Sequence, residues 1–244
     1  MKVENISPVI AAAGKGTRSK LDYPKCLFEI DGIPIINRIL DNFCNFHENP
    51  TIITSTFGKK KIQHHLQESY PSCRIVVQKQ QLGMGDAVLT LNDVGDSLKE
   101  NILLIWGDIP FIKKDTILSM CNHFLKTNSS FTLLTRKMPN PYTIVKRDQS
   151  NKILSVTETR EMGKNKLITF GERDLGLFIF KKKLVLDFLS MNLENKFGQS
   201  TKEHGFLYII EHLVKSGYLV NSYTSTDKNE SISFNSISDI KGFI

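Results

Sequence analysis

Residues 8–25 read PVIAAAGKGTRSKLDYPK and bring together an apolar run, two glycines and several cations. The apolar run predicts a short buried strand over residues 7–12. Gly14 and Gly16 then allow a tight turn whose backbone N–H groups point inward. A turn of this kind, followed by a helix N-terminus, favours negative charge. The stretch therefore predicts an anion site directly after the first strand.

Three cations strengthen this interpretation. Lys15, Arg18 and Lys25 lie in or just after the turn, and Arg18 can bind phosphate oxygens through two hydrogen bonds. We therefore expect a triphosphate to bind here. The third glycine of a dinucleotide fingerprint is missing and no G-x-x-x-x-G-K-[ST] occurs, so neither of those motifs applies. The alternative is a strand-to-helix turn whose cations are merely solvated.

The letters AAGKGTR at residues 12–18, followed by the Pro24-Lys25 pair, resemble the signature of nucleotidyltransferases that join a nucleoside triphosphate to a sugar 1-phosphate. The resemblance implies a GT-A-like α/β fold: a Rossmann-like, mainly parallel central sheet flanked by helices, with a smaller antiparallel acceptor-binding subregion. It implies catalytic roles for Arg18 and Lys25. It also implies a set of nucleotide-binding residues in the turn: Ala12, Ala13, Gly14, Lys15, Gly16 and Thr17.

The order of apolar runs along the chain supports the same fold class. Up to about residue 125, short apolar runs alternate with helical patterns, which indicates βαβ units and a mainly parallel sheet. Within this part we expect a strand at residues 26–30 and a helix at 35–46. Further on, the predicted elements are a three-stranded antiparallel meander at 131–136, 143–147 and 153–157, and a strand at 176–180 that returns to the main sheet. We expect a single domain, 1–244, with a nucleotide-binding part (1–128) and an acceptor-binding part (129–244).

Residues 78–87 leave a strand, turn on two glycines and enter a helix. The Gln78 amide both donates and accepts hydrogen bonds, as a pyrimidine base requires. The pattern Q-x-x-x-L-G-x-G-x-A resembles the uracil-reading segment of bacterial N-acetylglucosamine-1-phosphate uridylyltransferases, which implies that Gln78 and Gly83 contact the base. Met84 and Asp86 stand where that family has Thr and His. The alternative is a helix-initiating turn with Asp86 as its N-cap.

Residues 102–106 form the most apolar predicted strand, and a carboxylate, Asp108, follows it closely. Asp108 would lie at the carboxyl end of a central strand, where open α/β sheets bind ligands, and its hard oxygens suit Mg²⁺. Gly107 allows a ligand to approach closely. The Gly-Asp pair matches a metal-binding pair of the resembling family, and Asn235 matches an asparagine that completes the metal site. The alternatives are an ordinary strand-end Asp and an ordinary loop Asn.

The second half carries the residues that the resemblance assigns to the acceptor. Besides Gly107, these are Thr143, Glu158 and Asp174. Asp174 stands where the acetylglucosamine enzymes have Asn, and Thr143 replaces a glycine, so the acceptor need not be N-acetylglucosamine 1-phosphate. No hexapeptide repeat occurs, so we expect no acetyltransferase activity.

Composition excludes several other classes. The chain has 244 residues, 40% of them apolar, and no run long enough for a membrane span. The net charge of +7 comes from scattered lysines, so we expect anionic small substrates rather than nucleic acid, with a polyanion patch as the alternative. The four cysteines lack C-x-x-C spacing, which favours a reduced, cytoplasmic protein without a disulfide framework or zinc site.

These features predict an enzyme in which an acceptor phosphate attacks the α-phosphorus of a pyrimidine nucleoside triphosphate and pyrophosphate leaves. UTP and a sugar 1-phosphate are favoured by the resemblance, and Mg²⁺ is the expected cofactor. Two other functions stay open: a cytidylyltransferase acting on a non-sugar phosphate or phosphonate, and a nucleotide sensor without turnover. The attacking phosphate is already ionised, so none of the six histidines needs a catalytic role. The oligomeric state is not fixed by the sequence.

Overall fold

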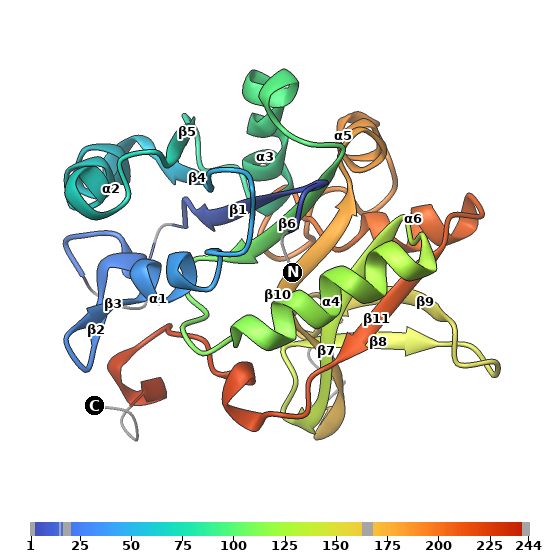
Figure 1. Cartoon of the computed structure of the whole chain (residues 1–244). Coiled ribbons are helices and arrows are strands. Elements are labelled where there is room, and N and C mark those ends of the chain that lie inside the picture. Colours follow the sequence, from blue (N-terminus) through green and yellow to red (C-terminus); the bar gives the residue numbers. More distant parts are fainter. Residues whose placement is uncertain (1–2, 15, 17–20, 163–167, 241–244) are drawn as a thin grey trace.

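A seven-stranded sheet in the order β11-β7-β10-β6-β1-β4-β5 forms the centre of the protein (Figure 1). The computed structural model describes residues 3–14, 16, 21–162 and 168–240. The strands of the sheet are β1 (Ile6–Ala12), β4 (Thr51–Ser55), β5 (Arg74–Gln78), β6 (Asn101–Trp106), β7 (Phe131–Pro139), β10 (Phe170–Lys181) and β11 (Val220–Thr224). β10 runs antiparallel to both β6 and β7, whereas the other neighbouring pairs are parallel. The expected mainly parallel sheet is thus confirmed.

Helices cover both faces of the sheet, which explains why its central strands are apolar on both sides. The helices are α1 (Ile35–Asp41), α2 (Thr56–Ser69), α3 (Met84–Leu89), α4 (Lys114–Thr127), α5 (Lys182–Ser190) and α6 (Ile209–Lys215). Along β6, Leu103 and Ile105 pack with the buried residues of α1, α2 and α4. Ile102 and Leu104 point the other way, into the core formed with α3, α5 and α6.

Short 3-10 segments complete the connections. They are η1 (Lys25–Leu27), η2 (Thr90–Ser97), η3 (Thr159–Glu161), η4 (Lys228–Ser231) and η5 (Ile237–Ile240). In the described part of the chain, no helix combines the length and the apolar character that crossing a membrane demands.

The segment after the glycine turn differs from the predicted strand at residues 26–30. Its first part is the 3-10 turn η1, held by a hydrogen bond of 2.9 Å from Leu27 N to Pro24 O. Only then does a small hairpin form from β2 (Glu29–Ile30) and β3 (Ile33–Pro34). The turn between them has positive φ angles at Asp31 and Gly32. The following helix, α1, ends at Asp41 instead of residue 46, because the chain changes to i→i+3 hydrogen bonds there, as from Phe43 N to Leu40 O.

The predicted meander is wrong in its pairing. β7 joins the main sheet between β10 and β11, while β8 (Thr143–Arg147) and β9 (Ile153–Glu158) pair with each other in a separate antiparallel ribbon. The ribbon lies beside β7 and packs on β10 (Figure 1). β10 does return the chain to β6 as expected, although it begins at Phe170, earlier than predicted.

Candidate active site

The glycine turn lies at the carboxyl end of β1 and borders a hollow of about 150 Å³. The residues around this hollow include Ala12, Gly14, Gly16, Lys25, Phe57 and Gln81. Four of them are predicted nucleotide or catalytic residues. Ala13 is buried beside them, whereas Lys15, Thr17 and Arg18 lie outside the described residues. The space is therefore bounded by the backbone that was predicted to hold phosphates.

Lys25 connects this hollow with the end of β6. Its Nζ lies 2.6 Å from Asp108 Oδ2 and donates a second hydrogen bond of 3.3 Å to Phe234 O. Gly107, between the strand and Asp108, donates its N–H to Ala11 O at 2.9 Å. The ends of β1 and β6 are consequently adjacent because the two strands are parallel neighbours. The structure thus brings Lys25 and Asp108, chosen from distant parts of the sequence, into direct contact.

Asp108 and Asn235 can supply two oxygen ligands to a hard cation whose remaining ligands are water and phosphate oxygens. Phe234 donates its N–H to Asp108 O at 2.7 Å, which places Asn235 next to this aspartate in the fold. The Asn235 amide nitrogen donates to Ser233 Oγ at 3.2 Å, and no protein donor contacts its Oδ1 in the described part of the chain. A carboxylate and an amide oxygen are ligands that Mg²⁺ accepts together with water and phosphates. Within residues 3–14, 16, 21–162 and 168–240, no three His, Cys, Asp or Glu side chains form a metal cluster.

Gln78, the residue predicted to contact the base, is buried and its amide is already hydrogen-bonded within the protein. It is 3% exposed, and its Nε2 donates to Gly83 O at 3.0 Å and to Asp86 Oδ2 at 2.8 Å. Gln81, which the sequence reasoning missed, lines the hollow and donates its amide N–H to Ala13 O. The sequence offers three glutamines as candidates in the run Gln78-Lys79-Gln80-Gln81. Only the conformation of the turn shows that the Gln81 amide is the one that faces the glycine turn.

The Gly83 turn is held by the segment before α6. Gly83 has a φ of 121°, and a Cβ at this position would lie 2.3 Å from His204 O. Leu82 O accepts from His204 N at 2.6 Å, and Gly85 N donates to His204 O at 3.0 Å. Burial lowers the pKa of His204 to about 4, so the imidazole is neutral at pH 7. His204 therefore packs against this turn as a neutral side chain.

The predicted acceptor residues Thr143 and Asp174 are in contact. Thr143 Oγ1 donates to Asp174 Oδ1 at 2.6 Å, and both residues are fully buried. The other oxygen, Oδ2, accepts from Tyr142 OH at 3.2 Å and from Gly176 N at 3.0 Å. Burial raises the pKa of Asp174, although these donors oppose the shift. Glu158 lies opposite Thr143 in the β8–β9 ladder and pairs with Arg160.

Two further residues near this group were not predicted. Tyr142 hydrogen-bonds to Asp174, and the centroid of its ring is 6.2 Å from that of Trp106, the residue before Gly107. Arg173 lies over the Tyr142 ring, with its Cζ 3.8 Å from the ring centroid. The ordinary signal for such a residue, a single polar side chain within an apolar strand, was weak for Arg173 because it stands between two other charged residues, Glu172 and Asp174.

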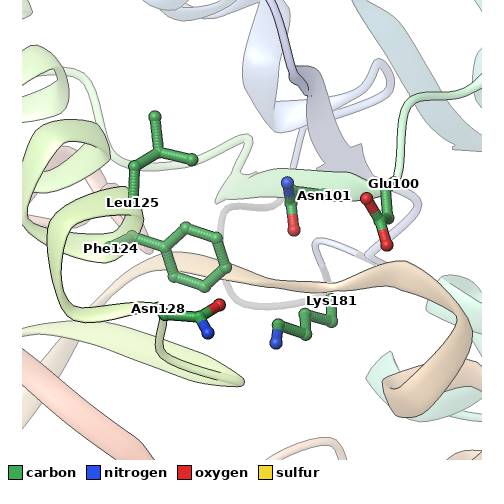
Figure 2. Close-up of a pocket in the computed structure, with 6 residues that line it drawn as sticks. All are labelled: Glu100, Asn101, Phe124, Leu125, Asn128 and Lys181. Atoms are coloured by element: carbon green, nitrogen blue, oxygen red, sulfur yellow. The ribbon is translucent and has the colours of Figure 1, made fainter.

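A second hollow of about 140 Å³ lies at the other end of β6 and is not part of this site. Figure 2 shows its lining side chains: Glu100, Asn101, Phe124, Leu125, Asn128 and Lys181. They come from the start of β6, the end of α4 and the end of β10. Asp108 follows the opposite, carboxyl end of β6. The hollow therefore lies at the opposite end of β6 from the residues at the glycine turn.

Comparison with known proteins gives a consistent result. The family model for the MobA-like NTP transferase domain matches residues 8–173. The bifunctional protein GlmU of Caldicellulosiruptor saccharolyticus is 30% identical over 231 residues, covering 93% of this chain and 49% of the relative. GlmU of Carboxydothermus hydrogenoformans is 28% identical over 225 residues, 91% of this chain and 48% of the relative. The chain thus spans about half the length of the curated relatives it matches.

Solved structures share the fold at low sequence identity. A putative glucose-1-phosphate thymidylyltransferase from Bacillus anthracis, in complex with sucrose, superposes with a TM-score of 0.75 at 16% identity. The match covers 97% of this chain and 93% of that chain. A UDP-glucose pyrophosphorylase complexed with UDP-glucose gives a TM-score of 0.69 at 16% identity, covering 92% and 91%. At this identity the likeness concerns the α/β fold alone.

Proposed function

The chain belongs to the MobA-like NTP transferase family, and on that premise we propose that it transfers the nucleotidyl group of a pyrimidine nucleoside triphosphate, UTP in the first place, to a sugar 1-phosphate. The family makes it a nucleotidyltransferase, in agreement with the resemblance seen in the sequence. The observation that carries the proposal is the position of Lys25. This lysine borders the hollow at the glycine turn and pairs with Asp108 at the end of β6.

In the proposed reaction an oxygen of the acceptor phosphate attacks the α-phosphorus, and the bond from that phosphorus to the bridging oxygen of pyrophosphate breaks. Both reactants are anions, so the residues must position them and offset their charge. Lys25 would offset the charge that develops on the α-phosphate. The N–H groups of Gly14 and Gly16, with Lys15 and Arg18, would hold the β- and γ-phosphates. No side chain needs to remove a proton, because the attacking phosphate is already ionised at pH 7.

Asp108 and Asn235 are the residues that we propose to hold Mg²⁺. The ion, when bound, supplies positive charge to the phosphate oxygens. The Lys25 ammonium contacts the same carboxylate, so this aspartate orients the lysine as well. Because of both roles, we expect substitution of Asp108 to lower turnover much more than it lowers the stability of the fold.

Recognition of the two substrates is assigned to the flanking segments. The 78–86 loop, with Gln78 and Gly83, would bind the base, and Gln81 would contribute its amide at the edge of the hollow. The acceptor would lie on the side of β8–β10, near Gly107, Thr143, Glu158 and Asp174. Thr143 and Asp174 are already bonded to each other, so they shape this side of the site as a unit.

A pyrophosphate-release screen over UTP, CTP, TTP, ATP and GTP, each with a panel of sugar 1-phosphates, tests the proposal. We expect magnesium-dependent release with UTP and at least one sugar 1-phosphate. Lys25→Met should lower the rate about 10²–10³-fold. Lys113→Met is the matched control, because Lys113 forms an ion pair of the same 2.6 Å length with Asp227, outside the site. Equal effects of the two substitutions would contradict the role of Lys25.

A second candidate is a cytidylyltransferase that acts on a non-sugar phosphate or phosphonate. It is favoured by Asp174, whose carboxylate accepts three hydrogen bonds from the protein and so has little capacity left for sugar hydroxyls. Adding CTP with alcohol phosphates and phosphonates to the same screen separates the two. Turnover that is restricted to these acceptors would replace the first proposal by the second.

A further inference from the structure

Arg173 is a largely buried cation, and most of its hydrogen-bonding groups have no partner among the residues that the structure describes. It lies on β10 directly before Asp174 and is 8% exposed. Its Nε donates to Asp174 O at 3.1 Å, and its guanidinium lies over the Tyr142 ring. In the described part of the chain, no protein acceptor contacts its two terminal nitrogens. A guanidinium has five N–H donors, so four of them lack a protein partner there.

The neighbouring carboxylate does not use this capacity. Asp174 takes hydrogen bonds from Thr143, Tyr142 and the N–H of Gly176, and none from the Arg173 side chain. The two charges act on each other only through space. Removing a cation from water is costly unless hydrogen-bonding partners replace the water. A ligand with an oxyanion would supply them, and the planar fork of arginine suits two oxygens of one carboxylate or phosphate.

The position of Arg173 relates it to the acceptor rather than to the nucleotide. The Tyr142 ring, on which it lies, is a neighbour of Trp106, and Trp106 is followed by Gly107 and Asp108. The negative charge of Asp108 contributes to raising the pKa of Tyr142, so this tyrosine is within electrostatic range of the predicted metal ligand. Arg173 itself contacts neither Lys25 nor Asp108, the groups proposed to serve the attacking phosphate.

We propose that Arg173 binds an oxyanion of the acceptor other than the attacking phosphate, so that the acceptor is a phosphate bearing a second acidic group. The inference rests on the proposed nucleotidyl transfer and deepens it by naming the class of acceptor. A carboxylate and a second phosphate offer the same pair of oxygens to the guanidinium. The test must therefore separate these two sources.

The first arm measures turnover with two acceptors that differ in one acidic group. Glucose 1-phosphate and glucuronic acid 1-phosphate are compared at saturating UTP and Mg²⁺, and glucose 1,6-bisphosphate tests a second phosphate. We expect the wild type to use an acidic acceptor with a kcat/KM at least tenfold above that for glucose 1-phosphate. Arg173→Gln should lower the value for that acceptor by roughly 10- to 100-fold, because charge-assisted bidentate hydrogen bonds are lost. Its KM for UTP and its turnover of glucose 1-phosphate should stay unchanged.

Arg136 provides the matched control. It lies directly opposite Arg173 in the β7–β10 ladder, and its Nη1 donates to Ser225 O at 3.0 Å. Arg136→Gln should leave the ratio between acidic and neutral acceptors unchanged. If Arg173→Gln proves too unstable, Arg173→Lys keeps the charge but lacks the fork. Arg173→Lys should retain turnover of glucose 1-phosphate and lose most of the preference for the acidic acceptor over the neutral one.

The second arm needs no turnover, which distinguishes failure of this inference from failure of the proposed function. Glucuronic acid 1-phosphate, glucose 1,6-bisphosphate and glucose 1-phosphate are titrated calorimetrically into the protein with and without the substitution. Weaker binding of an acidic compound to Arg173→Gln, with unchanged binding of glucose 1-phosphate, supports the inference even if no pyrophosphate is released. A wild type without preference for either acidic compound, or a substitution that weakens all three equally while lowering thermal stability, overturns it.

Discussion

Asp108→Asn should have a large effect on turnover and only a small effect on the stability of the fold. It removes the carboxylate charge that pairs with Lys25 at 2.6 Å while keeping the shape of the side chain. The two side chains are 17% and 22% exposed, and ion pairs that water still reaches stabilise proteins by about 1 kcal/mol or less. Lys25 also keeps its hydrogen bond to Phe234 O. For a chain of this size we expect the melting temperature to fall by no more than about 2–4 °C.

The catalytic effect of the same substitution should be much larger. Losing one preorganised charged group lowers turnover about 10²–10³-fold, which corresponds to about 3–4 kcal/mol in the transition state. The assays are scanning calorimetry and magnesium-dependent pyrophosphate release, at a temperature where both proteins are folded. Asp227→Asn is the control, because Asp227 is 24% exposed and pairs with Lys113 at the same 2.6 Å. Turnover of Asp108→Asn within tenfold of the wild type would refute the assignment of this residue.

Three further predictions concern the frame of the site. Gly83→Ala should destabilise the fold by at least about 2 kcal/mol in urea unfolding, because its Cβ would lie 2.3 Å from His204 O at a φ of 121°. Gly95→Ala, with no atom within 4 Å of its Cβ, should have a small effect, and equal losses would contradict this explanation. Thr143→Val should cost about 1–3 kcal/mol, because Asp174 loses a buried donor. Thr132→Val should be close to neutral, since no partner of Thr132 Oγ1 exists within the described residues; the reverse order would disprove the argument. His204 has a folded pKa of about 4, below its ordinary 6.5, so the unfolded chain binds more protons between these values. The stability that it contributes should be complete above pH 6.5 and decline as the pH falls toward about 4. His204→Gln should lack this part of the pH dependence in urea unfolding, and an unchanged slope would count against it.

The part of the site built on the parallel sheet could be predicted from the sequence. Apolar runs located β1 and β6, and chemistry that follows such strands must gather at their carboxyl ends. The contact between Lys25 and Asp108 agrees with that expectation. The run at residues 26–30 was misread because a few apolar residues suit a 3-10 turn and a strand equally well, and the hydrogen bond to Pro24 O decides between them.

The acceptor side could not be predicted to the same extent, because its geometry depends on pairing between distant segments. Nothing local shows that β7 pairs with β10 while β8 pairs with β9. Residues 172–174 are charged, and they become part of a strand through the ladder with β7. The Thr143–Asp174 hydrogen bond and the stacking of Arg173 on Tyr142 follow from that pairing. For this reason Asp174 was a candidate in the sequence and Arg173 was not.

The fate of each phosphate of the nucleotide tests the central claim most directly. The protein is incubated with Mg²⁺, the acceptor panel and UTP labelled with ³²P at either the α- or the γ-phosphate. The account predicts that the α-label appears in a new nucleotide–acceptor product and the γ-label in pyrophosphate. Transfer of the γ-label to an acceptor, or its release as orthophosphate while the α-label stays in UDP, would contradict it.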